Sequence, residues 1–288
     1  MNLDWSSAWP APAKLNLFLH VVGRRADGYH LLQTVFRFID LCDTLRFEPR
    51  TDSRIVLATP MPGVPDEQNL VVRAALALQE QVGAGGTAPG VTIHLEKRIP
   101  QGGGLGGGSS DAATTLVALN HLWGSGLSRI QLQTIGLGLG ADVPVFIHGR
   151  SCFAEGVGER FTDVVVPDAW YLLTLPDVTV PTPAIFRDPA LKRDTPAIDP
   201  AGWHEGVGHN DLEPVACRLY PEVAQHLDVL RRFGDARMTG SGACCFVAFP
   251  DREAAEAACR SLPGDMAALT VRGLPFHPHV QACMGGND

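Results

Sequence analysis

Apolar and polar residues alternate in short runs along much of the chain, as they do in strands that bury one face. Residues 13–22 alternate and then become apolar, and we expect a strand there. The same reasoning predicts strands over residues 32–38, 44–47, 55–58, 91–95, 151–154, 170–175 and 268–272, and a strand, a glycine turn and a strand within residues 237–249.

Other segments place apolar residues at helical spacing. Residues 69–82 form one such segment, and Asn69 is a credible N-cap. Pro144 is expected to interrupt any regular helix over residues 142–147, because proline lacks a backbone donor. Strands and helices mix without the regular βαβ order of a parallel sheet, which predicts an α+β fold. Further helices are predicted over residues 110–123, 128–139 and 251–261, with one or two more within 211–233.

The composition is that of a globular protein, and the net negative charge makes a nucleic-acid partner unexpected. Of the 288 residues, 45% are apolar and 19% are charged, and the formal net charge is −8. Nucleic-acid binding requires a basic face, so we expect no nucleic-acid partner. No run approaches the roughly 18 apolar residues of a membrane span, so we expect no membrane partner either. A phosphorylated ligand would have to meet local positive charge or oriented backbone amides.

The first residues and the cysteines bear on the compartment. The opening stretch, MNLDWSSAWPAPAKLN, lacks the charged region and apolar run of a secretory signal. The seven cysteines form no C-x-x-C pair, and their odd number suits a reducing compartment. We therefore expect a cytoplasmic protein, as a monomer or a weak homodimer.

The stretch QGGGLGGGSSDAAT, residues 101–114, carries the strongest chemical signal. It matches the G-x-G-x-x-G spacing of a dinucleotide-binding loop, but no acidic residue between Asp111 and Asp142 is present to bind a ribose. The lysine of a Walker A loop does not follow the glycines, and the H-R-D and D-F-G triplets of protein kinases do not occur. These three nucleotide motifs are therefore disfavoured.

The glycines still suit a phosphate site, because they let the backbone turn tightly and approach a ligand. Ser109 and Ser110 stand where a helix would begin, and free amides at a helix N-terminus bind phosphate without a lysine. The alternative is a flexible turn that one of these serines caps, with Asp111 as a favourable charge in the first helical turn. The six glycines directly before S-S-D-A-A favour phosphate binding.

Residues 100–110, PQGGGLGGGSS, resemble the phosphate loop of the GHMP kinases, which are small-molecule kinases of the galactokinase and mevalonate kinase type. Three other stretches narrow the resemblance: PAKLNL at 12–17, RADGYH at 25–30 and GADVPVF at 140–146. In this order, the four stretches resemble the members of the family whose alcohol substrate carries a cytidine diphosphate group.

The resemblance implies two lobes. Residues 1–160 would form an N-terminal lobe like the second domain of ribosomal protein S5, and residues 161–288 a ferredoxin-like C-terminal lobe. It also implies transfer of the γ-phosphate of ATP, accompanied by Mg²⁺, to the tertiary 2-hydroxyl of a methylerythritol unit that carries cytidine diphosphate. We assign no metal ligand, because the acidic ligand that some GHMP kinases place upstream of the catalytic aspartate is missing.

Two residues match the catalytic pair of the family. Asp142 would accept the proton of the hindered alcohol, and Lys14 would offset charge on the moving phosphoryl group. Without the resemblance, Asp142 also fits a helix N-cap, and Lys14 fits a solvated strand edge. Asn16 shares the face of Lys14 in a regular strand, and we expect it to bind the substrate or Asp142.

Five residues match the family's substrate site. Tyr29 and His30 resemble its cytidine-recognition pair, since a tyrosine can stack on a base and a histidine can bind the polar edge of cytosine. Phe186 matches a second aromatic residue across that base, and Thr182 and Pro183 would shape the same wall. Outside this context, such residues would only be packing residues.

The ATP site would be formed by the glycine loop and the residues before it. Lys97 is close enough in sequence to approach the adenine or the phosphates, and would otherwise be a solvated strand end. The G-S-G turn at 240–242 resembles a turn of the second lobe that faces the site. The resemblance implies the ATP-binding residues Lys97, Pro100, Gln101, Gly102, Gly103, Gly104, Leu105, Gly106, Gly107, Gly108, Ser109 and Ser110.

Overall fold

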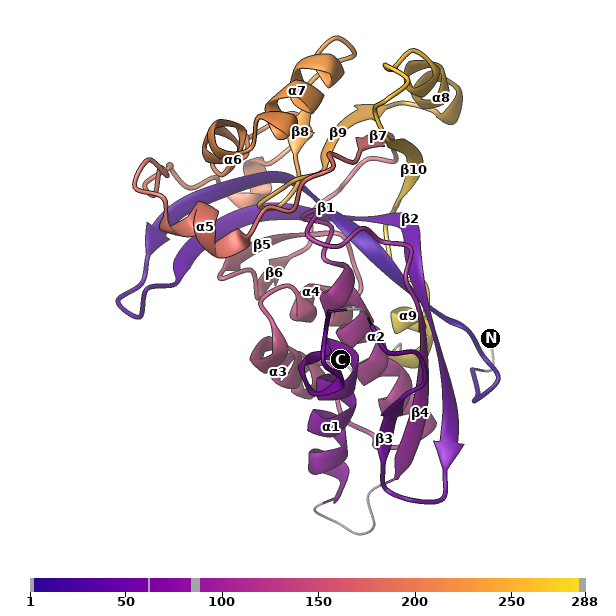
Figure 1. Ribbon diagram of the computed structural model, residues 1–288. Helices are drawn as coiled ribbons and strands as arrows, with labels where there is room; N and C mark the ends of the chain where they lie inside the picture. The colour runs from indigo at the N-terminus through magenta and orange to yellow at the C-terminus, as the bar shows by residue number, and fades with distance from the viewer. Residues whose placement is uncertain (1–2, 62, 84–88, 285–288) are drawn as a thin grey trace.

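A long antiparallel strand pair divides the molecule into two lobes. The computed structural model describes residues 3–61, 63–83 and 89–284. In Figure 1, strands β1 (Trp9–Arg24) and β2 (His30–Arg50) cross the middle, with helices α1–α4 on one side and α6–α8 on the other. We call these sides the first and the second lobe. The mixture of strands and helices confirms the predicted α+β class.

The sheet continues from one lobe into the other. Its strand order is β3-β4-β2-β10-β7-β9-β8, while β1 and β5 pair with other parts of β2, and β6 pairs with β5. The pairing of β10 with β2 joins the two lobes. The other strands are β3 (Ile55–Leu57), β4 (Gly90–Glu96), β5 (Cys152–Gly156), β6 (Arg160–Thr162), β7 (Trp170–Thr174), β8 (Arg237–Met238), β9 (Cys245–Phe249) and β10 (Ala268–Leu274).

Helices cover the sheet in both lobes. The first lobe contains α1 (Leu70–Gly83), α2 (Gly107–Leu122), α3 (Arg129–Leu139) and α4 (Val143–His148), with a 3-10 turn at Asp66–Gln68. The second contains α5 (Thr182–Arg187), α6 (Glu213–Leu219), α7 (Pro221–Leu230) and α8 (Arg252–Arg260), with a 3-10 turn at Pro200–Gly202. No helix in the described ranges is both long and apolar enough to cross a membrane.

The core of the first lobe surrounds α2, whose residues Ser110–Asn120 are all buried. Helix α9 (Val280–Met284) returns to this core, where Val280 is fully buried. Helix α9 therefore packs on the first lobe, after the chain has passed through the second. The division into residues 1–160 and 161–288 stays a prediction.

One long strand, β2, replaces the two strands expected over residues 32–38 and 44–47. The residues between the two expected strands include the acidic residues Asp40 and Asp43. One of these, Asp43, is fully buried because it forms an ion pair with Lys97 at the end of β4. A charge that is neutralised across the sheet can remain inside a strand, so the predicted break was wrong.

The structure bears on two predictions about helices: the effect of Pro144 and the N-cap at Asn69. Pro144 was expected to prevent a regular helix, but it lies in the first turn of α4, where no intrahelical donor is needed. Pro221 likewise begins α7 and separates it from α6. The predicted N-cap is confirmed, since the Asn69 side chain accepts a hydrogen bond from the amide of Val71 at 3.0 Å.

Candidate active site

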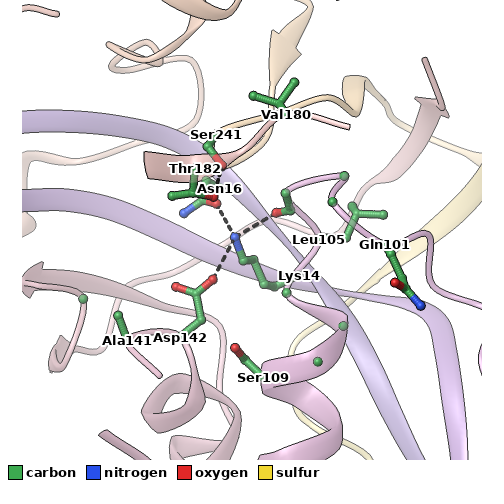
Figure 2. Close-up of a pocket in the computed structure, with 18 of the residues that line it drawn as sticks. Lys14, Asn16, Gln101, Leu105, Ser109, Ala141, Asp142, Val180, Thr182 and Ser241 are labelled. Atoms are coloured by element: carbon green, nitrogen blue, oxygen red, sulfur yellow. Dashed lines mark hydrogen bonds and ion pairs between the residues drawn. The ribbon is translucent and has the colours of Figure 1, made fainter. Parts of the chain in front are cut away.

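A pocket of about 990 Å³ lies between the two lobes. Its walls come from β1, β2, the glycine loop, the first residues of α2, the residues just before α4, helix α5 and the turn at residues 240–242. Figure 2 shows Lys14 and Asp142 facing each other in this pocket, close to the glycine loop and Ser109. The pocket brings together the predicted residues Lys14, Asn16, Tyr29, His30, Lys97, Pro100, Gln101, Gly102, Gly103, Gly104, Leu105, Gly106, Gly107, Gly108, Ser109, Asp142, Thr182, Pro183 and Phe186.

Lys14 lies on β1, and its ammonium group is almost completely removed from solvent. Its Nζ donates to Asn16 Oδ1 at 2.6 Å and to the carbonyl of Gly104 at 2.9 Å, and it lies 3.3 Å from Asp142 Oδ2 (Figure 2). The ammonium therefore makes two hydrogen bonds and one ion pair. The side chain is only 3% exposed, so the solvated strand-edge alternative is wrong. Lys14 is thus a buried cation with a fixed position.

Asp142 occupies the N-cap position of α4, but its side chain makes no capping hydrogen bond. The carboxylate instead points toward Lys14 (Figure 2), and the side chain is 36% exposed. A carboxylate that is held by an ammonium on one side and open to the pocket on the other can accept a proton from a bound alcohol.

Asn16 faces the same side of β1 as Lys14, as the two-residue spacing predicts. Its Oδ1 accepts from Lys14, while its Nδ2 donates to Thr34 Oγ1 at 2.9 Å. Thr34 in turn donates to the carbonyl of Phe18. Asn16 was expected to bind the substrate or Asp142; among the described residues it has no hydrogen bond to Asp142, and it contributes to the pair by holding Lys14.

The glycine loop adopts backbone conformations that side chains rarely allow. Gly102, Gly104 and Gly106 have φ angles of 70°, 76° and 72°. A Cβ on Gly104 would lie 2.1 Å from the carbonyl oxygen of Thr239 in the second lobe. The glycines therefore serve close packing between the lobes as well as tight turning.

Helix α2 begins at Gly107, three residues before the predicted start at Ser110. Its N-cap is Gly106, which has no side chain to cap the helix, so the alternative of a turn capped by Ser109 or Ser110 is wrong. The first helical hydrogen bond runs from the amide of Ser110 to Gly106, and within the described residues the amides of 107–109 have no acceptor. These free amides at a helix N-terminus form a phosphate-binding position. Ser110 itself is fully buried and does not line the pocket.

We expect Gly104→Ala to raise the KM for ATP by at least about tenfold and to lower thermal stability. The left-handed backbone alone costs an alanine about 1–2 kcal/mol, and the contact with Thr239 adds to this. Initial rates at varied ATP concentration, with a thermal melt, measure both effects. Gly138→Ala is the control, because Gly138 is exposed in α3 with no atom within 4 Å of an added Cβ. Equal KM values for the two variants would contradict the prediction.

Lys97 and Asp111 form a buried ion-pair cluster beneath the loop. Lys97 Nζ pairs with Asp43 and lies 2.6 Å from Asp111 Oδ2. Asp43 also accepts the amide of Ile99 at 2.8 Å. Burial raises the pKa of Asp111 to about 7, while the two carboxylates outweigh burial and raise the pKa of Lys97. Lys97 therefore lines the pocket as a paired residue, and not as a solvated strand end.

The place expected for Asp111, in the first turn of its helix, was wrong. It is the fifth residue of α2, and it is 2% exposed. Its partner Asp43 is a site residue that the sequence analysis missed, since an acidic residue in a strand 54 positions before Lys97 gives no local signal.

The other end of the pocket is aromatic. The rings of His30 and Phe186 lie with their centroids 4.9 Å apart, and Tyr29 beside them is 63% exposed. Thr182 Oγ1 lies 2.7 Å from Ser241 Oγ, so the start of α5 contacts the glycine turn at 240–242. We call this end of the pocket, with Tyr29, His30 and Phe186, the aromatic slot; its rings offer faces on which a flat ring can stack.

Comparisons with known proteins give the family. The GHMP kinase N-terminal domain model matches residues 69–150, and the C-terminal domain model matches residues 190–268. The chain is 62% identical to the 4-diphosphocytidyl-2-C-methyl-D-erythritol kinase of Dechloromonas aromatica, over 94% of this chain and 98% of that protein. The chain belongs to the family of 4-diphosphocytidyl-2-C-methyl-D-erythritol kinases. It is therefore a small-molecule kinase with ATP as its phosphate donor.

Other matches agree with this family. The 4-diphosphocytidyl-2-C-methyl-D-erythritol kinase of Thiobacillus denitrificans is 57% identical over 95% of this chain and 97% of that protein. A crystal structure of a 4-(cytidine 5′-diphospho)-2C-methyl-D-erythritol kinase superposes with a TM-score of 0.78 and 37% identity, covering 93% of this chain and 99% of that one. A mevalonate kinase structure, at 15% identity and a TM-score of 0.65, shares the fold, with 93% of this chain and 99% of that one covered.

In this member of the 4-diphosphocytidyl-2-C-methyl-D-erythritol kinase family, one further residue at the aromatic end was missed. Arg193 donates from Nε to His30 Nε2 at 3.1 Å. It lies in the proline-rich stretch after α5, where the sequence has no periodicity that would place a side chain. Among the described residues, no group of three or more histidine, cysteine, aspartate or glutamate side chains is arranged to hold a metal ion.

Proposed function

We propose that this protein transfers the γ-phosphate of ATP to the 2-hydroxyl of 4-diphosphocytidyl-2-C-methyl-D-erythritol, giving the 2-phosphate and ADP. This reaction belongs to the non-mevalonate route to isoprenoid precursors. The observation that carries the proposal is one pocket with the Lys14–Asp142 pair beside the glycine loop and the His30–Phe186 slot at its other end. The names of the 57–62% identical relatives support the same substrate.

The glycine loop and α2 bind the phosphates of ATP in this proposal. The free amides of residues 107–109 and the positive end of the helix face negative charge. No lysine of the Walker type is required, because oriented amides supply the donors. Lys97 stabilises the first turns of α2 through its ion pairs with Asp43 and Asp111.

Asp142 is the base that accepts the proton of the 2-hydroxyl. In phosphoryl transfer, positioning and electrostatic stabilisation provide most of the rate enhancement. Lys14 fixes the carboxylate and brings a positive charge next to the transferring group. The ammonium already donates to Asn16 and to the Gly104 carbonyl and pairs with Asp142, so a close contact with a phosphate oxygen is easier if it releases one of these partners. The carbonyl of Gly104 belongs to the phosphate loop and is the acceptor best placed for this exchange.

The cytidine group occupies the aromatic end. Tyr29 and Phe186 stack on the faces of the base, while His30 binds its edge. Thr182 and Pro183 close the wall, and Ser241 orients Thr182. The diphosphate spans the distance to the methylerythritol unit, whose 2-hydroxyl then reaches Asp142.

Mg²⁺ accompanies ATP in the proposal. The pocket offers only a few protein oxygen atoms as ligands for this ion. This ion prefers oxygen ligands and usually keeps several waters beside phosphates and one or two carboxylates. Asp142 and Ser109 carry oxygen atoms in the pocket near the loop, whereas Asp111 is paired with Lys97. The set fits an ion held mainly by phosphate and water oxygens, which neutralises charge on the phosphates.

The compartment is also part of the proposal. The seven cysteines are all free, as expected in a reducing environment. This supports the cytoplasmic location that was predicted from the sequence.

An ADP-release assay tests the function. We expect turnover with ATP and 4-diphosphocytidyl-2-C-methyl-D-erythritol, at least about 1000-fold above the rates with mevalonate or homoserine, since a site built to bind a polar group rejects analogues without it. CMP and CDP are expected to inhibit competitively against the alcohol substrate and not against ATP. Equal rates with an alcohol that lacks cytidine, or no effect of CDP, would refute the assignment.

A further inference from the structure

A single guanidinium joins the two aromatic residues of the slot. Arg193 Nε donates to His30 Nε2 at 3.1 Å, and one terminal nitrogen donates to the carbonyls of Phe186 at 3.0 Å and Asp188 at 2.7 Å. The other terminal nitrogen donates to the carbonyl of Leu191 at 2.9 Å. Arg193 thus contacts the ring of one aromatic residue and the backbone of the other.

The hydrogen bond to Nε2 fixes the tautomer of His30. An arginine side chain has donors only and keeps its charge in proteins, so Nε2 must be the unprotonated acceptor. The proton of the neutral ring is then on Nδ1. Burial, with a smaller contribution from the charge of Arg193, lowers the pKa of His30 and favours this neutral ring. Within the described residues Nδ1 has no hydrogen-bond partner, and the ring lines the pocket.

Arg193 also fixes the helix that carries Phe186. A cation near a helix C-terminus that binds the last carbonyls stabilises that end. Helix α5 is short, so its orientation depends on such contacts. The segment around Arg193 is itself anchored, since the amide of Thr195 donates to the carbonyl of Val21 at 3.1 Å and that of Ile198 to Gln33 Oε1 at 2.7 Å. The guanidinium is therefore held in place from outside the slot.

We propose that Arg193 is a positioning residue that sets the choice of base: it holds His30 as an Nδ1–H donor and Phe186 at stacking distance. This rests on the proposed function. A fixed N–H donor matches the unprotonated N3 of cytosine, whereas uracil presents an N3–H donor at the same place on its edge. Two facing donors leave both without acceptors, which disfavours uracil strongly.

Arg193→Met tests the proposal, because methionine keeps the unbranched apolar stem of the side chain and removes every donor. We expect the KM for the cytidine substrate to rise about 10- to 100-fold, as for the loss of a hydrogen bond to a charged group, with kcat within about threefold. The preference for the cytidine substrate over its uridine counterpart is expected to fall by a similar factor. Arg218→Gln is the matched control. It removes an arginine that pairs with Asp188 and does not touch His30, and its base preference is expected to equal that of the wild type.

Two further measurements separate positioning from a general loss of structure. In a His30→Ala background, Arg193→Met is expected to leave the ratio of cytidine to uridine substrate unchanged, because the donor is already missing. In ¹⁵N–¹H spectra of histidine-labelled protein, the His30 signal, assigned by its loss in His30→Ala, is expected to show the Nδ1–H tautomer. Arg193→Met should shift it toward Nε2–H.

An unchanged tautomer and an unchanged base preference in Arg193→Met would overturn the inference. An equal loss of preference in the His30→Ala background would also overturn it, since the effect would then not act through His30. No turnover of the cytidine substrate by the wild type would instead refute the proposed function. The tautomer measurement needs no substrate, so it still reports on the contact between Arg193 and His30.

Discussion

Replacing Asp142 with asparagine is expected to reduce kcat by at least about 1000-fold. General-base catalysis contributes about 10²- to 10⁴-fold, and the amide has the size of the carboxylate but cannot accept the proton of the alcohol. It also removes the negative charge that lies 3.3 Å from Lys14 Nζ. Because Asp142 makes no capping hydrogen bond, the helix that follows it should be unaffected. Steady-state ADP release measures kcat, and circular dichroism checks the fold.

Asp163→Asn is the matched control for this variant. Asp163 is 70% exposed, pairs with His148 and Arg150, and does not line the pocket. Its kcat is expected to stay within about twofold of the wild type, since surface ion pairs contribute little. If Asp142→Asn retained a kcat within about fivefold of the wild type, another group would be the base.

The sequence predicts best those parts of the site and fold in which the interacting residues are close together in sequence. Lys14 and Asn16 are two positions apart on a strand, so they share a face, and the structure joins them by a hydrogen bond. Asn69 caps α1 because a short amide side chain can reach the amide of N2. The alternation of residues 13–22 likewise predicts a strand that lies within β1. In each case the interacting atoms are only a few residues apart.

The start of α2 shows where local reasoning fails. Gly107 and Gly108 have poor helix propensity, so the sequence favours a helix that begins at the serines. The helix begins earlier because residues Ser110–Asn120 are buried against the sheet and neighbouring helices, and tertiary packing outweighs the cost of two glycines. The local sequence does not show what the helix packs against. It therefore cannot show that packing outweighs the poor helix propensity of the two glycines.

Long-range charge pairs are the other part that the sequence does not reveal. Nothing near Asp43 in the sequence points to its partner Lys97, which lies 54 positions later and which the fold places against it. Arg193 and His30 are 163 positions apart, and their contact exists only because the segment after α5 crosses β2. Family motifs gave Lys14, Asp142 and His30, but the residues that hold these side chains in position required the three-dimensional structure.

Replacing Lys14 with methionine is expected to reduce kcat by about 100- to 1000-fold. Methionine keeps most of the packing against Phe36 and Gly106, and removes a buried positive charge that acts at the site of phosphoryl transfer. The loss also leaves Asn16 Oδ1 without its donor, and leaves the carbonyl of Gly104 with only the long hydrogen bond from Thr239 Oγ1 at 3.5 Å. Unsatisfied buried acceptors cost about 1–3 kcal/mol each, so the melting temperature should fall as well. Lys192→Met, which changes an exposed lysine, is the control for both measurements.

The double variant Lys14→Met, Asp142→Asn decides whether the two residues act as a unit. If Lys14 works mainly by fixing the Asp142 carboxylate, its loss matters little once the carboxylate is gone, and kcat of the double variant should lie within about tenfold of Asp142→Asn alone. If the two losses multiply, Lys14 acts on the phosphoryl group independently of Asp142. The contacts of Lys14 favour the first outcome, because its ammonium already donates to Asn16 and to the Gly104 carbonyl and its charge faces the Asp142 carboxylate. Single-turnover rates of the four proteins, measured at saturating ATP, give the coupling directly.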